Sequence, residues 1–214
     1  MDAHLNRFNW ISSIYDLLTR SIFGRHLHDA QLFYLKEIPQ NSNVLIIGGG
    51  TGWLLKELIH INPTCKIWYI EASSSMIDAA KSKVKGAEQK HLFFIHGTEN
   101  SIPQEIQYDV VITNFFFDLF SSTTLASVIS KINASLSLNG IWLVSDFIHQ
   151  DKWWQRVLLS TMYFFFRLTC GIESGTLPCW EQSLAEAGLK EERAQFFYSS
   201  FIKSAFFVRN KTIG

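Results

Sequence analysis

Short apolar runs recur along the chain and are separated by stretches in which apolar residues have helical spacing. Five of these runs predict buried strands: Val44–Ile47, Ile67–Ile70, Leu92–Ile95, Val110–Ile112 and Ile141–Val144. Helical patterns lie between most of them, at Trp53–Ile61, Ser74–Lys85 and Thr123–Leu136. This alternation predicts right-handed βαβ crossovers and a mostly parallel sheet with helices on both faces.

Further segments flank this alternating region. Helical patterns precede the first strand and follow the fifth, at Arg7–Thr19, Leu27–Glu37, Asp151–Cys170 and Cys179–Ala187. Two final strand-like runs, Gln195–Tyr198 and Phe201–Val208, predict an antiparallel hairpin. We therefore expect one α/β domain over residues 1–214, with an N-terminal helical cap (1–40), a core (41–147), a helical insertion (148–190) and a terminal hairpin (191–214).

The sharpest motif follows the first predicted strand, where Gly48-Gly49-Gly50-Thr51-Gly52 leads directly into a helix. A buried strand that breaks into glycines lets a ligand approach the backbone at the carboxyl edge of a sheet. Trp53 stands where a G-x-G-x-x-G dinucleotide motif has its third glycine, and the chain contains no G-x-x-x-x-G-K-[ST] phosphate loop. Glu71 ends the second strand, where a carboxylate can bind both hydroxyls of a ribose.

In order and spacing, Val44–Gly52, Ile67–Glu71 and Ser75–Lys81 resemble class I S-adenosylmethionine-dependent methyltransferases, over about Asn43–Phe147. The resemblance implies a Rossmann-like, doubly wound seven-stranded sheet with an antiparallel C-terminal hairpin. It also implies S-adenosylmethionine as cofactor and S-adenosylhomocysteine as product. More narrowly, Tyr15–Leu18 is similar to the Y-D segment of ubiquinone- and menaquinone-biosynthesis methyltransferases, in which this helix helps close over the cofactor.

The same resemblance implies a role for each cofactor-binding residue. The glycine loop would line the methionine part, Glu71 would bind the ribose, the turn after the third strand would contact adenine, and the end of the fourth strand would lie beneath the sulfonium. The implied cofactor residues are Gly48, Gly49, Gly50, Gly52, Glu71, Ala72, Met76, Gly97, Thr98, Glu99, Asn114, Phe115 and Tyr15.

The sequence departs from the family pattern at two positions. Ile46 stands where many members carry an acidic residue, and spermidine synthases share this departure. Thr98 stands where many members carry Asp after the glycine that matches Gly97. Both departures leave room for a chain that has lost catalysis.

The methyl acceptor is less determined. Methyl transfer is an in-line displacement that depends on alignment, and a base is needed only if the acceptor loses a proton. The catalytic candidates near the carboxyl edge are Asn114, Asp146 and His149. A helix-capping role for Asp146 and an ordinary loop position for His149 are the structural alternatives. We find no paired carboxylates, no nucleophile–His–acid order and no metal-ligand cluster, so we expect no metal and no hydrolysis.

Composition narrows the function further. Nineteen basic and nineteen acidic residues cancel, which argues against a nucleic-acid binder. Asn114–Phe117 also lacks the prolines of an N-P-P-[YF] nucleic-acid methyltransferase motif. The three widely spaced cysteines support neither disulfides nor zinc. The N-terminus has no signal-peptide pattern, and the longest apolar stretch contains Arg167 and is too short to span a bilayer. We therefore expect a cytoplasmic protein.

The segment Asp151–Cys170 is unusually aromatic, in a chain that has 18 Phe and 7 Trp but only 18% charged residues. Three interpretations of this segment stay open: a lid over an apolar acceptor pocket, a homodimer interface, or part of the core. A lid of this kind could also contact a membrane surface. We predict O- or C-methylation of a small aromatic or apolar acceptor. The alternatives are an aminopropyltransferase resembling spermidine synthase and a non-catalytic cofactor-binding or interaction module.

Overall fold

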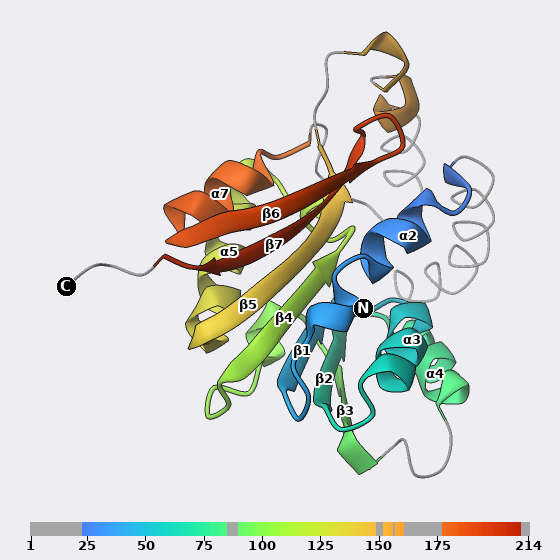
Figure 1. The fold of residues 1–214 in the computed structure, drawn as a ribbon, viewed down its shortest axis with the longest axis vertical. Coiled ribbons are helices and arrows are strands. Elements are labelled where there is room, and N and C mark those ends of the chain that lie inside the picture. The colour runs from blue at the N-terminus through green and yellow to red at the C-terminus, as the bar shows by residue number, and fades with distance from the viewer. Residues whose placement is uncertain (1–22, 85–89, 149–151, 156, 161–176, 211–214) are drawn as a thin grey trace.

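Seven strands form one sheet in the order β3-β2-β1-β4-β5-β7-β6 (Figure 1). The computed structural model describes residues 23–84, 90–148, 152–155, 157–160 and 177–210. The seven strands are β1 Asn43–Ile47, β2 Lys66–Glu71, β3 Leu92–His96, β4 Tyr108–Asn114, β5 Leu136–Phe147, β6 Leu189–Phe197 and β7 Ile202–Arg209. Strands β1 to β5 are parallel, and β7 is antiparallel to both β5 and β6. The predicted fold class is confirmed.

The strand order reverses at β1. Val44 pairs with Ile67 of β2 on one side and with Val110 of β4 on the other, so the chain runs outward to β3 and then returns to β4. In doubly wound sheets, ligands bind in the crevice at the carboxyl ends of the strands where the order reverses. Because the glycine-rich segment follows β1 directly, it lies at this point.

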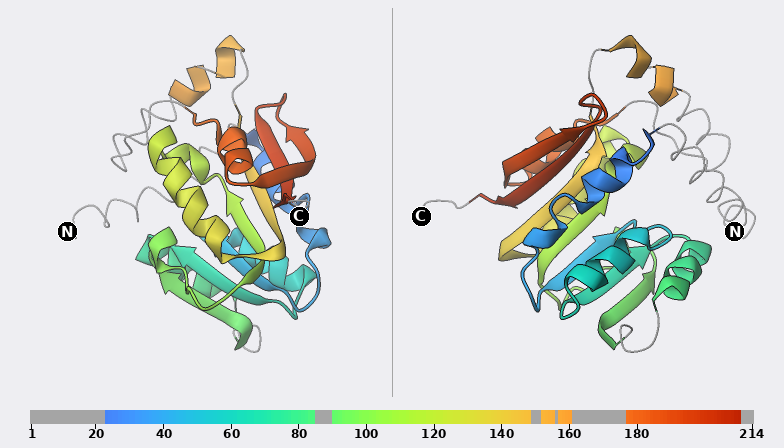
Figure 2. Two further views of the ribbon diagram at one scale, coloured as in Figure 1. Left: turned by 90° about the vertical axis from the view of Figure 1, so that its left-hand side faces the viewer. Right: turned by 45° about the vertical axis from the view of Figure 1, so that its right-hand side comes forward.

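Helices cover both faces of the sheet. Figure 2 shows α5 and α7 on one face, and α2, α3 and α4 on the other. The helices and 3-10 turns are α2 His26–Leu32, η1 Leu35–Glu37, α3 Trp53–Ile61, α4 Ser74–Lys83, η3 Glu99–Ser101, η4 Phe117–Leu119, α5 Ser122–Ser135 and α7 Trp180–Glu186. The helices α4 and α5 each start after a serine, Ser73 and Ser121, whose hydroxyl accepts a backbone N–H of the first turn.

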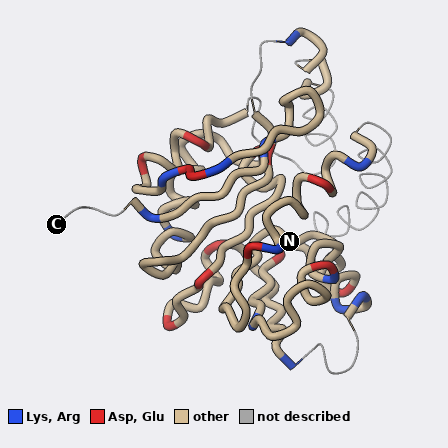
Figure 3. The backbone as a smooth tube through the Cα atoms, viewed as in Figure 1, with Lys and Arg blue, Asp and Glu red and all other residues tan. Residues whose placement is uncertain are grey.

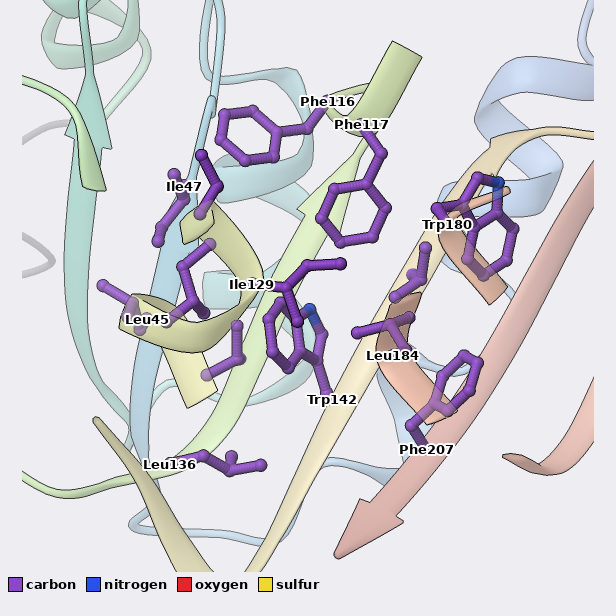
Figure 4. Close-up of a cluster of buried hydrophobic side chains, with 14 of the residues drawn as sticks. Leu45, Ile47, Phe116, Phe117, Ile129, Leu136, Trp142, Trp180, Leu184 and Phe207 are labelled. Atoms are coloured by element: carbon purple, nitrogen blue, oxygen red, sulfur yellow. The ribbon is translucent and has the colours of Figure 1, made fainter. Parts of the chain in front are cut away.

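Alternate side chains of each buried strand enter different cores. Leu45 and Ile47 of β1 pack with the α5 and α7 side, whereas Val44 and Ile46 pack with the α3 side. Figure 4 shows the first of these clusters, in which Trp142 of β5 lies beside Ile129 and its ring centroid is 6.1 Å from that of Phe117. Because both faces are covered, the strands read as continuous apolar runs in the sequence.

A third cluster lies at the carboxyl edge. It joins the start of α2, the end of β5, the β6–β7 hairpin and the short helical stretch 157–160. Its buried members are Phe23, Leu27, Ala30, Phe147, Leu159, Phe201 and Ile202. Within the described parts of the chain, no helix has the length and hydropathy that a bilayer span requires.

Several element boundaries differ from the sequence expectations. The helix expected over Leu27–Glu37 is divided into α2 and η1, and β6 begins at Leu189 rather than Gln195. Most residues in the first half of β6 are exposed and polar, because it is an edge strand, so they carry no apolar signal. The helix expected over Arg7–Thr19 lies outside the described residues, and that over Asp151–Cys170 is described, as helix, only at 153–155 and 157–160.

Candidate active site

The glycine loop between β1 and α3 has a backbone that only glycine adopts readily. Gly48, Gly50 and Gly52 have φ values of 67°, 65° and 78°, in the left-handed region. A Cβ atom on Gly48 would lie 2.7 Å from the Phe116 ring, and one on Gly52 would lie 2.6 Å from the Cβ of Ala80. At Gly50, apart from its two chain neighbours, no atom of the described residues lies within 4 Å of that position. The loop is therefore packed on both flanks and open at its centre, where a ligand can approach the backbone.

Tyr69 supports this loop from β2. A Cβ on Gly49 would lie 2.2 Å from the Tyr69 ring, and the Tyr69 hydroxyl donates a 2.8 Å hydrogen bond to the carbonyl of Gly50. Burial, with a smaller effect of Glu71, raises the pKa of Tyr69 well above its usual value. Tyr69 is not among the residues predicted from the sequence, where its only signal is a phenol in the middle of a buried strand.

Glu71 links the glycine loop to the start of α4. Its Oε2 accepts the N–H of Gly50 and its Oε1 accepts the N–H of Ser73, both at 2.9 Å, and the residue is only 8% exposed. Each carboxylate oxygen has a second lone pair, so the group can still accept hydrogen bonds from ligand hydroxyls. Ala72 and Met76 lie on the same short connection and first helical turn.

The turn after β3 lies beside Glu71, because His96 pairs with Glu71 in the sheet register. It contains the three residues expected to contact adenine, Gly97, Thr98 and Glu99. A Cβ on Gly97 would lie 2.1 Å from the hydroxyl oxygen of Ser101, so η3 packs directly on this glycine. The Thr98 hydroxyl caps η3, and Glu99 lies 3.6 Å from the ammonium of a lysine on α5.

The end of β4 presents an unsatisfied donor. The Asn114 side-chain nitrogen is buried and has no hydrogen-bond partner among the residues that the structure describes. The next residue, Phe115, has a φ of 49°, and its N–H donates to the carbonyl of Ser145 at 2.7 Å. A bulky residue in the left-handed region is unusual, so the chain turns sharply here.

Asp146 and Asp118 form a buried carboxyl pair that is not predicted from the sequence. Asp146 is fully buried, and its Oδ2 accepts the N–H groups of Phe116 (3.1 Å) and Phe117 (2.8 Å). Asp118 is 7% exposed, and its Oδ1 has no hydrogen-bond partner within the described part of the chain. Burial raises the pKa of Asp118 to about 7. Burial, and then the charge of Asp118, raises the pKa of Asp146 well above its usual range, against the effect of its backbone hydrogen bonds.

The structure thus brings most of the predicted site residues to one edge, with the glycine loop, Glu71, the turn after β3, Asn114 and Asp146 on neighbouring strand ends. Tyr15 and His149 lie outside the described residues. Among the residues that the structure describes, no three His, Cys, Asp or Glu side chains form a group that could hold a metal. Lys and Arg are interspersed with Asp and Glu along the described chain (Figure 3).

An aromatic path leads from the insertion to the site. Trp154 contacts Phe201 (ring centroids 6.0 Å apart), Phe201 contacts Phe147 (5.1 Å), and Phe147 contacts Phe115 (5.1 Å). The insertion is also held to the hairpin, because the Lys152 ammonium donates to the Ser199 carbonyl at 3.0 Å. Described insertion residues therefore reach the end of β4 through packed rings.

Trp53 has a structural role beside the glycine loop. Its ring stacks on His28 of α2, with centroids 3.9 Å apart and an interplanar angle of 16°. The bulky residue that argued against a dinucleotide motif thus joins α2 to the start of α3.

A family model described as a methyltransferase domain matches residues 45–142. Among curated proteins, a malonyl-[acyl-carrier protein] O-methyltransferase of Priestia megaterium is 35% identical over 115 residues, which are 54% of this chain and 39% of that protein. One from Bacillus anthracis is 29% identical over 143 residues, 66% of this chain and 51% of that protein. The matches cover about half or less of each relative.

Solved structures share the fold at low identity. A chain of the complex between the Haloferax volcanii Trm112 methyltransferase activator and a methyltransferase has a TM-score of 0.70 at 13% identity, covering 94% of this chain and 97% of that one. A SAM-dependent methyltransferase from Aquifex aeolicus has a TM-score of 0.62 at 18% identity, with coverages of 92% and 97%. CalO1, solved with bound SAH, has a TM-score of 0.62 at 16% identity, with coverages of 86% and 53%.

Proposed function

We propose that this chain, a class I S-adenosylmethionine-dependent methyltransferase by its fold and its matching family, binds S-adenosylmethionine against the glycine loop and transfers its methyl group to a small acceptor. The observation that carries the proposal is the Glu71 bridge. A buried carboxylate holds the N–H of Gly50, while no described neighbour fills the space where a Cβ of that glycine would lie. This arrangement supports the proposal, because the glycine backbone and the carboxylate that would bind the ribose are next to each other at the point where the strand order reverses.

The described residues fit this cofactor. Glu71 would accept the ribose hydroxyls, the open backbone at Gly50 would receive the methionine part, and the unpartnered Asn114 amide would donate to an acceptor atom of the ligand. Gly97–Glu99 would lie along adenine, and Phe115 beside the sulfonium. When bound, the cofactor supplies an electrophilic methyl group on a sulfonium. The chain then has to align the acceptor and exclude water.

For the acceptor we favour an aromatic or otherwise apolar molecule, methylated on oxygen or carbon. The support is the cluster at the carboxyl edge, whose buried members are all apolar and which reaches the site through Phe115 and Phe147. An unpaired charged group would be costly to bury among such side chains. The O-methyltransferase names of the curated relatives support oxygen as the accepting atom.

A malonyl thioester is a second candidate acceptor, because the matching relatives carry that name. The aminopropyltransferase alternative is weaker. Its polyamine substrate would need exposed acidic groups, whereas Asp118, the acid that follows β4 most closely, is buried beside Asp146. These alternatives make different predictions in one assay.

The test is calorimetric titration with S-adenosylmethionine and S-adenosylhomocysteine, followed by transfer of a labelled methyl group to two acceptor sets. One set contains phenols and quinols, and the other malonyl thioesters. We expect binding of both nucleosides and transfer to the first set. Absence of binding would refute the proposal, transfer only to thioesters would correct the acceptor, and binding without any transfer would support the non-catalytic module.

A further inference from the structure

One buried side chain of β5 holds the turn that follows β4. Besides the two bonds from Phe116 and Phe117 to Oδ2, the N–H of Phe147 donates to Oδ1 of Asp146 at 2.8 Å. All three bonds come from backbone N–H groups, and the side chain has no exposed surface. Asp146 therefore acts on the chain around it and does not reach the acceptor directly.

The turn held by Asp146 touches the glycine loop. Phe115 has its strained backbone there, and such conformations persist only where the surroundings hold them. The ring of the next residue, Phe116, lies so close to Gly48 that a Cβ atom would come within 2.7 Å of it. Figure 4 shows Phe116 beside Ile47, at the end of β1. The backbone of this turn thus decides where the ring meets the loop.

From this geometry we propose that Asp146 is a positioning residue for the cofactor. By holding the backbone of Phe116 and Phe117, it keeps the Phe116 ring against Gly48 and the glycine loop in the shape that binds S-adenosylmethionine. The inference rests on the proposed function and gives Asp146 an indirect role in place of contact with the acceptor.

The role needs the two oxygens of a carboxyl group rather than an amide. Asp accepts hydrogen bonds at both oxygens, whereas Asn has one acceptor oxygen and cannot serve both the Phe116–Phe117 pair and Phe147. The residue opposite Asp146 on β7 is Lys203, but its ammonium lies 2.5 Å from Glu181 and 2.7 Å from Glu191. The backbone N–H groups are thus the described hydrogen-bond donors to the Asp146 carboxylate.

A double-mutant cycle on cofactor affinity tests the inference. We expect Asp146→Asn to weaken binding of S-adenosylmethionine about tenfold, the scale of one hydrogen bond. Phe116→Leu should weaken it as well, and the double variant should lose little more than either single variant, because both changes act through one contact. Asp109→Asn is the matched control. Its carboxylate also accepts a backbone N–H, from Asn43 at 2.9 Å, but at the opposite edge of the sheet.

Additive losses, or unchanged affinity in Asp146→Asn, would overturn the inference. If Asp146→Asn does not fold, hydrogen exchange of the Phe116 and Phe117 amides in the wild-type chain decides. S-adenosylhomocysteine should slow both, because coupling between two sites is reciprocal, and unchanged rates would refute it. A wild-type chain that binds neither nucleoside would instead refute the proposed function itself.

Discussion

At the scale of single residues, the glycine loop of the candidate site has three positions where a side chain would clash and one where it would not. Gly48, Gly49 and Gly52 are each blocked by a neighbouring side chain, whereas none of the described residues fills the position of a Cβ on Gly50. Glu71 holds Gly50 through its N–H. We therefore expect a change of side chain at these residues to alter the affinity for the proposed cofactor.

Replacement of Glu71 by alanine should weaken S-adenosylmethionine and S-adenosylhomocysteine alike, by about 1.5–3 kcal/mol, because the carboxylate is proposed to bind the ribose that both contain. Titration calorimetry measures the loss. Asp78→Asn, at an exposed position of α4, is the control. Equal affinity of wild type and Glu71→Ala would show that the ribose lies elsewhere.

Asp118 should make folding stability depend on pH. Its carboxyl keeps a proton to about pH 7 in the folded chain but loses it near 3.8 when unfolded. The folded state therefore binds more protons between these values. The contribution of Asp118 to the free energy of unfolding is complete below the pKa of the unfolded chain. It is lost as the pH rises through the pKa of the folded chain. We expect the free energy of unfolding to decline less with rising pH in Asp118→Asn than in the wild type, as measured by urea denaturation between about pH 4.5 and 7.5. A slope identical to wild type would contradict the assignment.

At the scale of elements, the strand ends were easier to predict than the elements around them. The runs of β1, β2 and β4 are covered on both faces, so burial alone makes them continuous in sequence, and the glycines mark where β1 stops. The position of Glu71 followed from the same pattern. The Asp118–Asp146 pair could not be predicted, because it depends on η4 and β5 meeting in space across many residues of sequence. The role of Tyr69 could not be predicted for the same reason, because it depends on β2 and the glycine loop meeting in space.

The turn η3 provides a prediction at this scale. Because Ser101 fills the space beside Gly97, Gly97→Ala should displace η3 and weaken both nucleosides through the adenine they share. A second change, Ser101→Gly, makes room for the methyl group and should restore part of the affinity. Calorimetry on the single and double variants tests this. Undiminished affinity in a folded Gly97→Ala protein would place adenine away from this turn.

At the scale of the whole molecule, the carboxyl edge gathers segments from distant parts of the sequence. The start of α2, the end of β5, the hairpin and residues of the insertion share one aromatic cluster. The outer side of the insertion helix also presents apolar residues, since Trp153 is 76% and Val157 58% exposed. The lid and interface interpretations thus concern different residues of the helical stretches 153–155 and 157–160: the packed ones and the exposed ones.

Trp154→Ala separates these interpretations. If the helix lines the acceptor site, loss of the ring contacts with Tyr198 and Phe201 should lower turnover of a phenolic acceptor at least several-fold while the affinity for S-adenosylmethionine stays unchanged. Trp153→Ala, on the outer side, should leave turnover unchanged. If instead Trp153→Ala alone alters the molar mass measured by light scattering, the segment is an oligomer interface.

The position of β7 between β5 and β6 has a consequence for biosynthesis. The strand that completes the sheet is the last of the seven to leave the ribosome, and until then β5 has an unpaired edge. The backbone N–H and C=O groups along the edge of β5 that β7 will pair with, over Ile141–Phe147, face the nascent chain's surroundings during this interval. An open apolar edge is a template for wrong pairing. A ribosome stalled before β7 should therefore hold a chaperone-dependent intermediate, and release of the final strand should end that dependence.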